Sequence, residues 1–161
     1  MKHVLVPVLM AGGLLAIQTP VAADTAHTSA ISREPLYAGI VKHAKALEAE
    51  THRLAKGDDP RADKTFATYA DAITALSADD LKGHYDLRAR GTDNDLKCIM
   101  MGISRDLPLK LDAIRSARPG DELKTAFDAM AQDLSDNIDV IVTPATTDSG
   151  LDCVIEFGKG A

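Results

Sequence analysis

The chain has 161 residues, with 24 acidic and 18 basic side chains and a formal net charge of −6 at pH 7. This balance argues against a nucleic-acid partner, because nucleic-acid binding depends on Lys and Arg neutralising phosphates. The chain has no Trp, three Tyr and three Phe, so it lacks the aromatic planes on which bases or sugars usually stack. The abundance of Ala and Leu favours helices over strands.

The chain begins with the features of a secretory signal peptide. Lys2 supplies a positive charge, and residues 4–17 are apolar apart from Pro and Gly. Val21-Ala22-Ala23 places small residues before a cleavage point at Asp24. We expect removal of residues 1–23 and a periplasmic or secreted domain of residues 24–161; an uncleaved leader acting as an anchor is the alternative. No other run approaches the roughly 18 apolar residues of a spanning helix, so no membrane span is expected after cleavage.

Two amphipathic helices are expected in the first half of the mature chain. Ser32 is a plausible N-cap ahead of Pro35, and the first helix should end near Lys56. A turn at residues 58–60 then opens the second helix. The apolar stripe of this second helix consists of Phe66, Tyr69, Ala70, Ile73 and Leu76.

A third and a fourth helix follow on either side of Gly91. Ser77 and Asp80 resemble a capping box with Asp in place of Glu, which predicts a third helix from Ser77 to Gly91. The fourth helix begins after Thr92. Pro108 lies in its continuation, where it either kinks one long helix or starts a new one.

The last helix and the tail differ in character. Apolar residues recur at helical spacing from Asp121 to Val140, after a turn at Pro119-Gly120. In residues 151–157 apolar and polar side chains partly alternate, and β-branched side chains are present, so this segment is expected to be extended. The expected fold is therefore a single all-α bundle of four to five helices with a short extended C-terminal tail.

Two cysteines lie far apart in this sequence. Cys98 falls on the fourth predicted helix and Cys153 falls in the tail. In an oxidising compartment they can form one intramolecular pair, which would tether the tail to the helix. The alternatives are a redox-active pair, which no Cys-x-x-Cys motif supports, and a disulfide-linked dimer.

One segment around Gly91 is dense in reactive side chains. His84, Tyr85, Arg88 and Arg90 are the candidate ligand or partner-binding residues. Two guanidinium groups near a helix corner could hold a small anion or a partner's carboxylate. An ordinary salt-bridged corner would contain the same residues and is the favoured alternative.

No cofactor is identified by the sequence, although three kinds can be examined. A haem in the bundle would take its axial ligands from His43, His52, His84, Met100, Met101 and Met130. Copper could use His84 with Met100 and Met101, and zinc could use the i,i+4 pair Glu48 and His52. None of these sets is complete, so no metal site is predicted.

The sequence contains no motif of a known catalytic machinery. Nucleophile-elbow, zinc-protease, P-loop and dinucleotide patterns are all absent. The leading hypothesis is therefore a non-enzymatic binding or protein-interaction module of the periplasm or the secreted fraction. The alternatives are a carrier of a small ligand, haem or metal inside the bundle, and an enzyme with a dispersed acid–base site.

Overall fold

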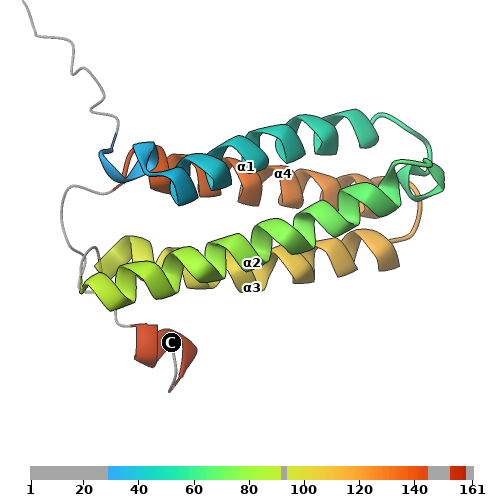
Figure 1. The fold of residues 1–161 in the computed structure, drawn as a ribbon. Coiled ribbons are helices and arrows are strands. Elements are labelled where there is room, and N and C mark those ends of the chain that lie inside the picture. Colours follow the sequence, from blue (N-terminus) through green and yellow to red (C-terminus); the bar gives the residue numbers. More distant parts are fainter. Residues whose placement is uncertain (1–28, 92–93, 145–152, 159–161) are drawn as a thin grey trace, which may run out of the picture.

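The structure is a computed structural model and describes residues 29–91, 94–144 and 153–158. The leader predicted over residues 1–23 lies outside the described residues. The described part is helical throughout and contains no strand (Figure 1). Its helices are α1 (Pro35–Leu54), α2 (Phe66–Arg90), α3 (Asn94–Ser116), α4 (Asp121–Val142) and the short α5 (Cys153–Phe157), with 3-10 turns at η1 (Ile31–Arg33) and η2 (Pro60–Ala62).

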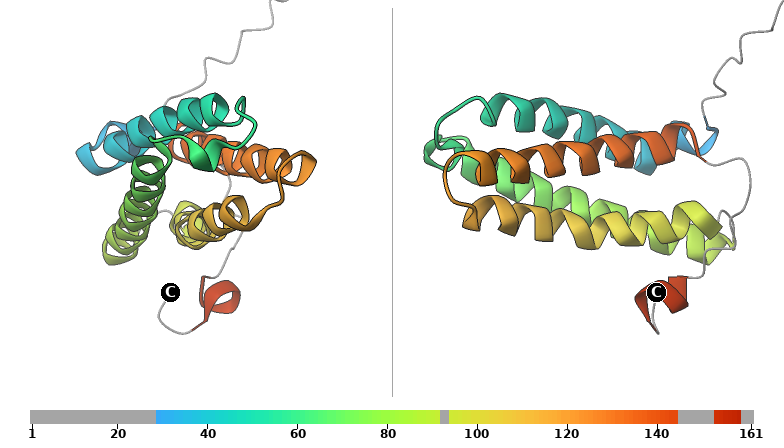
Figure 2. Two further views of the ribbon diagram at one scale, coloured as in Figure 1. Left: turned by 90° about the vertical axis from the view of Figure 1, so that its right-hand side faces the viewer. Right: turned by 180° about the vertical axis from the view of Figure 1, so that it is seen from behind.

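The four long helices form a bundle, which confirms the predicted all-α fold class. Figure 1 shows α1 beside α4 and α2 beside α3, and the end-on view in Figure 2 shows the two pairs stacked on each other. The contacts are most extensive between α2 and α3 and between α1 and α4, whereas α1 and α2 touch each other least among the neighbouring long helices. The short connections make successive helices antiparallel.

The core is built from the apolar stripes that face the bundle axis. Ile40, Ile73, Leu107 and Leu134 are all almost completely buried. Burial of each such side chain favours folding by roughly 1.5–3 kcal/mol before entropy is subtracted. The largest side chains without exposed surface also include Tyr37, Phe127, Leu87, Met100, Leu111 and Ile114.

Two glycines stand at helix boundaries that the sequence predicted. Gly91 follows α2 with φ of 63°, and Gly120 precedes α4 with φ of 98°. These left-handed conformations favour Gly because it has no Cβ. The start of α1 differs from the prediction, because Ser32 lies in η1 and Glu34 occupies the N-cap without a side-chain cap.

The predicted helix start at Ser77 is wrong, because α2 runs unbroken from Phe66 to Arg90. Ser77 instead forms a hydrogen bond to α3, a helix that continues past Pro108. Pro108 has no N–H, so it cannot donate to the carbonyl of Ser104 one turn earlier. The Ser77 hydroxyl fills that role from α2, donating to the Ser104 carbonyl oxygen at 2.6 Å.

Ser77→Ala is expected to lower the free energy of unfolding by about 1–2 kcal/mol, because it leaves the Ser104 carbonyl without its donor. Pro108→Ala restores a backbone N–H at that place, so the same substitution should cost less in a Pro108→Ala background. A double-mutant cycle from urea unfolding should give a coupling of about 1 kcal/mol.

The control for this cycle is Thr74→Ala, which removes another hydroxyl from α2. The Thr74 hydroxyl donates at 3.0 Å to the Ala70 carbonyl in its own helix. The cost of Thr74→Ala in unfolding free energy should therefore be the same with Pro108 and in the Pro108→Ala background. Strictly additive costs for Ser77→Ala and Pro108→Ala would contradict the proposed role of Ser77.

The C-terminal segment is tethered as predicted but does not have the predicted conformation. Cys98 and Cys153 form a disulfide with their Cα atoms 5.0 Å apart. Residues 153–157, expected to be extended, form the helix α5. Tertiary contacts explain the difference: Phe157 lies over Gly102, where an added Cβ would be 3.4 Å from its ring, and Arg105 stacks on the same ring at 5.0 Å. A compact turn places this aromatic side chain and the cysteine on one side, against α3.

Candidate functional site

The four residues predicted to hold an anion or a partner's carboxylate lie near the end of α2, but they do not converge on one point. His84 has no exposed surface, whereas Tyr85 is about half exposed. The two rings contact each other edge to face, with centroids 5.1 Å apart. Arg88 and Arg90 are exposed. The buried imidazole therefore belongs to the interior and the other three side chains belong to the surface.

Arg90 takes part in a network that joins the end of α2 to the start of α1. Its guanidinium donates to both carboxylate oxygens of Glu34, at 2.6 and 3.1 Å, and to Asp86 at 3.3 Å. Asp86 also accepts a hydrogen bond from the Tyr37 hydroxyl at 2.7 Å. Burial and this bond to Asp86 hold the pKa of Tyr37 well above its usual range. The guanidinium group of Arg90 is therefore already bound to carboxylates of the same molecule.

His84 faces α3 rather than solvent. Its Nδ1 lies 2.8 Å from the carbonyl oxygen of Lys97, which can only accept, so Nδ1 carries the proton. Its Nε2 is buried without a hydrogen-bond partner among the described residues. An imidazole held through Nδ1 in this way resembles the arrangement of a metal-ligating histidine, which leaves Nε2 for the metal.

The structure separates the other side chains that were weighed as metal or haem ligands. Met100 lies in the main core, while Met101 packs with the disulfide in a second cluster beneath α5. His43 and His52 are exposed on α1, and Met130 is buried in α4. Among the described residues, no three His, Cys, Asp or Glu side chains come close enough together to hold a metal ion.

A polar pair lies inside the bundle and crosses it from α2 to α4. The Asn137 amide donates to Asp80 Oδ2 at 2.9 Å, and neither side chain has exposed surface. Burial raises the pKa of Asp80 to about 8, and the charges of Asp79 and Asp133 act in the same direction against the opposing bond from Asn137. Oδ1 of Asp80 and Oδ1 of Asn137 have no partner among the described residues. A proton on Asp80 supplies a donor to a pair that otherwise has two unpaired acceptors.

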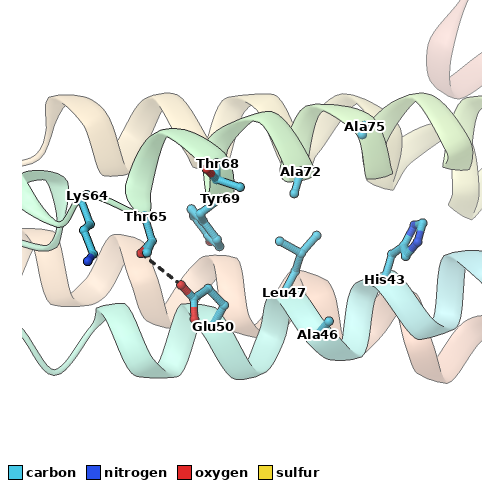
Figure 3. A pocket seen from close by; sticks show the side chains of 10 residues that line it. All are labelled: His43, Ala46, Leu47, Glu50, Lys64, Thr65, Thr68, Tyr69, Ala72 and Ala75. Atoms are coloured by element: carbon cyan, nitrogen blue, oxygen red, sulfur yellow. Dashed lines mark hydrogen bonds between the residues drawn. The ribbon is translucent and has the colours of Figure 1, made fainter.

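A groove runs between α1 and α2, which make the fewest contacts among the neighbouring long helices (Figure 3). Its volume is about 710 Å³, and most of its lining surface is apolar. Leu47, Tyr69 and Ala72 form its middle part, with Ala46 and Ala75 beside them. Tyr69 shows the groove only its ring, because its hydroxyl is hydrogen-bonded to Thr51 at 2.8 Å. This volume lies within the range of about 300–1,000 Å³ that is typical of small-molecule sites.

The sequence carried only a weak signal for this groove. Three alanines, at positions 46, 72 and 75, stand where longer side chains would fill the space between the helices. Alanine is also the strongest helix former, so the same residues are expected in any helix. A second groove of about 560 Å³, between α3 and α4, is likewise lined by alanines, including Ala113, Ala126 and Ala129.

Comparison with protein-family models, with curated proteins and with solved structures finds no match for this chain. Among the described residues, no helix combines the length and the apolar character that crossing a membrane requires.

Proposed function

We propose that this protein is a non-enzymatic binding module of the periplasm or the secreted fraction, and that it holds a small apolar molecule in the groove between α1 and α2. The groove's volume and apolar lining carry this proposal. The predicted leader and the disulfide are compatible with an oxidising compartment. This narrows the hypothesis of a general binding or interaction module to one surface and one kind of ligand.

The groove fits a ligand better than the bundle interior does. The interior positions that a buried carrier would need are filled by side chains such as Phe127, Met100 and Leu134, all nearly without exposed surface. Close packing of this kind leaves little room for a ligand unless helices separate. The groove is open to solvent along its length, so a ligand enters without displacing the core.

Titration with the neutral fluorescent probe N-phenyl-1-naphthylamine tests this proposal. The full mature protein should bind the probe saturably. Ala72→Phe should weaken binding at least tenfold, because the new ring occupies the middle of the groove. The matched control is Ala126→Phe, since Ala126 is also a partly buried alanine packed against the core and lines the α3–α4 groove.

Circular dichroism and urea unfolding should show that both variants remain folded. The proposal is overturned if the wild-type protein binds no probe, or if Ala72→Phe binds it as well as the wild type does. A loss of binding confined to Ala126→Phe would place the site in the other groove and would also overturn the proposal.

A further inference from the structure

We infer that the ligand of the α1–α2 groove has an apolar body and a carboxylate head, and that the head is held at Lys64; this inference rests on the proposed function. The two ends of the groove differ in their polar groups. Figure 3 shows Lys64 at one end, near Thr65 and Glu50, and His43 at the other. The two ends also differ in which of their hydrogen-bonding groups already have partners within the molecule.

The acceptors at the Lys64 end are already engaged. Arg53 donates to both carboxylate oxygens of Glu50, at 2.7 and 2.8 Å, and to Asp63 at 3.0 Å. The Thr65 hydroxyl donates to Asp63 at 2.8 Å. The bonds from Arg53 hold the pKa of Glu50 below its usual value. The backbone N–H and the hydroxyl of Thr65, together with Arg53, lower the pKa of Asp63 to about 2. Both groups therefore stay ionised at neutral pH and remain bound to Arg53.

The donors at the same end are not engaged. Neither the Lys64 ammonium nor the Thr68 hydroxyl has a side-chain hydrogen bond or an ion pair with any residue in the described ranges. A head group that docks here must accept hydrogen bonds. A carboxylate does so and is attracted by the ammonium.

The opposite end is already paired, and the space between is apolar. His43 Nδ1 lies 3.8 Å from Asp79 Oδ2, so the polar group at that end already has a partner within the molecule. From Phe66 to Ala75, α2 rises about 14 Å, which sets the approximate length of the groove. The alkyl chain of decanoate has about this length. Its head would lie at Lys64 and its tail along Leu47, Ala72 and Ala75.

Displacement of N-phenyl-1-naphthylamine by three decyl compounds tests the inference. Decanoate, decan-1-ol and decyltrimethylammonium share one chain and differ in head-group charge. Below their micelle concentrations, decanoate should bind the wild-type protein most tightly and the ammonium compound least tightly. Lys64→Met should weaken decanoate binding about fivefold, as expected for one ion pair made by an exposed lysine, and leave probe binding unchanged. Lys64→Glu should make the ammonium compound the preferred ligand.

The matched control is Lys45→Met, because Lys45 is an exposed lysine of α1 that lies outside the groove. It should leave all affinities unchanged. If the probe binds but Lys64→Met has no effect on decanoate, or if decyltrimethylammonium binds the wild type best, the carboxylate inference is overturned and the groove function stands. If the probe does not bind the wild-type protein, the proposed function is overturned, and the carboxylate inference is overturned with it.

Discussion

The stability of the wild-type protein is expected to fall as the pH rises from about 4 to about 8, and Asp80→Asn is expected to remove most of this fall. The cause is the buried pair of Asp80 and Asn137 inside the bundle. Burial raises the pKa of Asp80 from an ordinary 3.8 to about 8. The folded protein therefore keeps this proton over a range of pH in which the unfolded chain has lost it.

The sign of the effect follows from proton linkage. Where the folded state binds more protons than the unfolded state, the free energy of unfolding decreases with increasing pH. For one proton the slope approaches about 1.4 kcal/mol per pH unit between the two pKa values. The contribution of Asp80 is therefore fully present below about pH 4 and is lost by the time the pH exceeds about 8.

Asp80→Asn keeps the shape of the side chain and its acceptor oxygen for Asn137 while removing the titration. The variant should have a flatter stability profile and should be more stable than the wild type at pH 8–9 by several kcal/mol. Urea unfolding at a series of pH values provides the measurement. Differences between variants matter more than absolute slopes, because burial also raises the pKa of Asp133, to about 6.

Asp71→Asn is the matched control, since it neutralises an exposed carboxylate on the same helix. Its profile should run parallel to that of the wild type. A wild-type protein as stable relative to Asp80→Asn at pH 9 as at pH 5 would show that Asp80 does not carry a raised pKa in the fold.

Replacing both cysteines is the second change with a large expected effect. Cys98→Ala with Cys153→Ala should lower the free energy of unfolding by about 2–4 kcal/mol. The disulfide closes a loop with a sequence separation of 55 residues, and its loss increases the conformational freedom of the unfolded chain. Circular dichroism should still show a helical bundle, because α1–α4 pack around a separate core.

The loss should be accompanied by local opening of α5. A five-residue helix is too short to be stable alone, and its buried apolar packing is limited to a small cluster around the disulfide, with Met101, Leu81 and Phe157. Hydrogen exchange of residues 153–157 should therefore become fast in the double variant. Phe157→Ala in the oxidised protein is the comparison, and it should cost less because the covalent tether remains. Unchanged exchange and an unchanged urea midpoint in the double variant would contradict this account.

Several features of the fold were accessible from the sequence because their signals are local. Helical spacing of apolar residues predicted the stripes of α1, α2 and α4, and most of those side chains are buried in the core. Gly91 and Gly120 marked helix boundaries, because the required backbone angles favour glycine. The pairing of Cys98 with Cys153 followed from there being only two cysteines.

Other features were decided by partners distant in the sequence. Ser77 looks like a helix start when only its neighbours are considered, but its hydroxyl is used by the Ser104 carbonyl that Pro108 leaves open. His84 looks like a surface residue beside Tyr85 and two arginines, yet the Lys97 carbonyl on α3 holds it inside. Local patterns cannot contain these bonds, because each joins two helices.

The candidate site belongs to this second group. The sequence by itself determined a helical chain with a net negative charge and predicted its intramolecular disulfide, whereas the leader stays a prediction. Only the tertiary structure placed alanines of α1 and α2 opposite each other, where their short side chains leave a groove, and buried Asp80 against Asn137. The physical reason is the same in both cases: an alanine or an aspartate is ordinary in any helix, and the helix that packs opposite it determines whether it lines a groove or carries a buried proton.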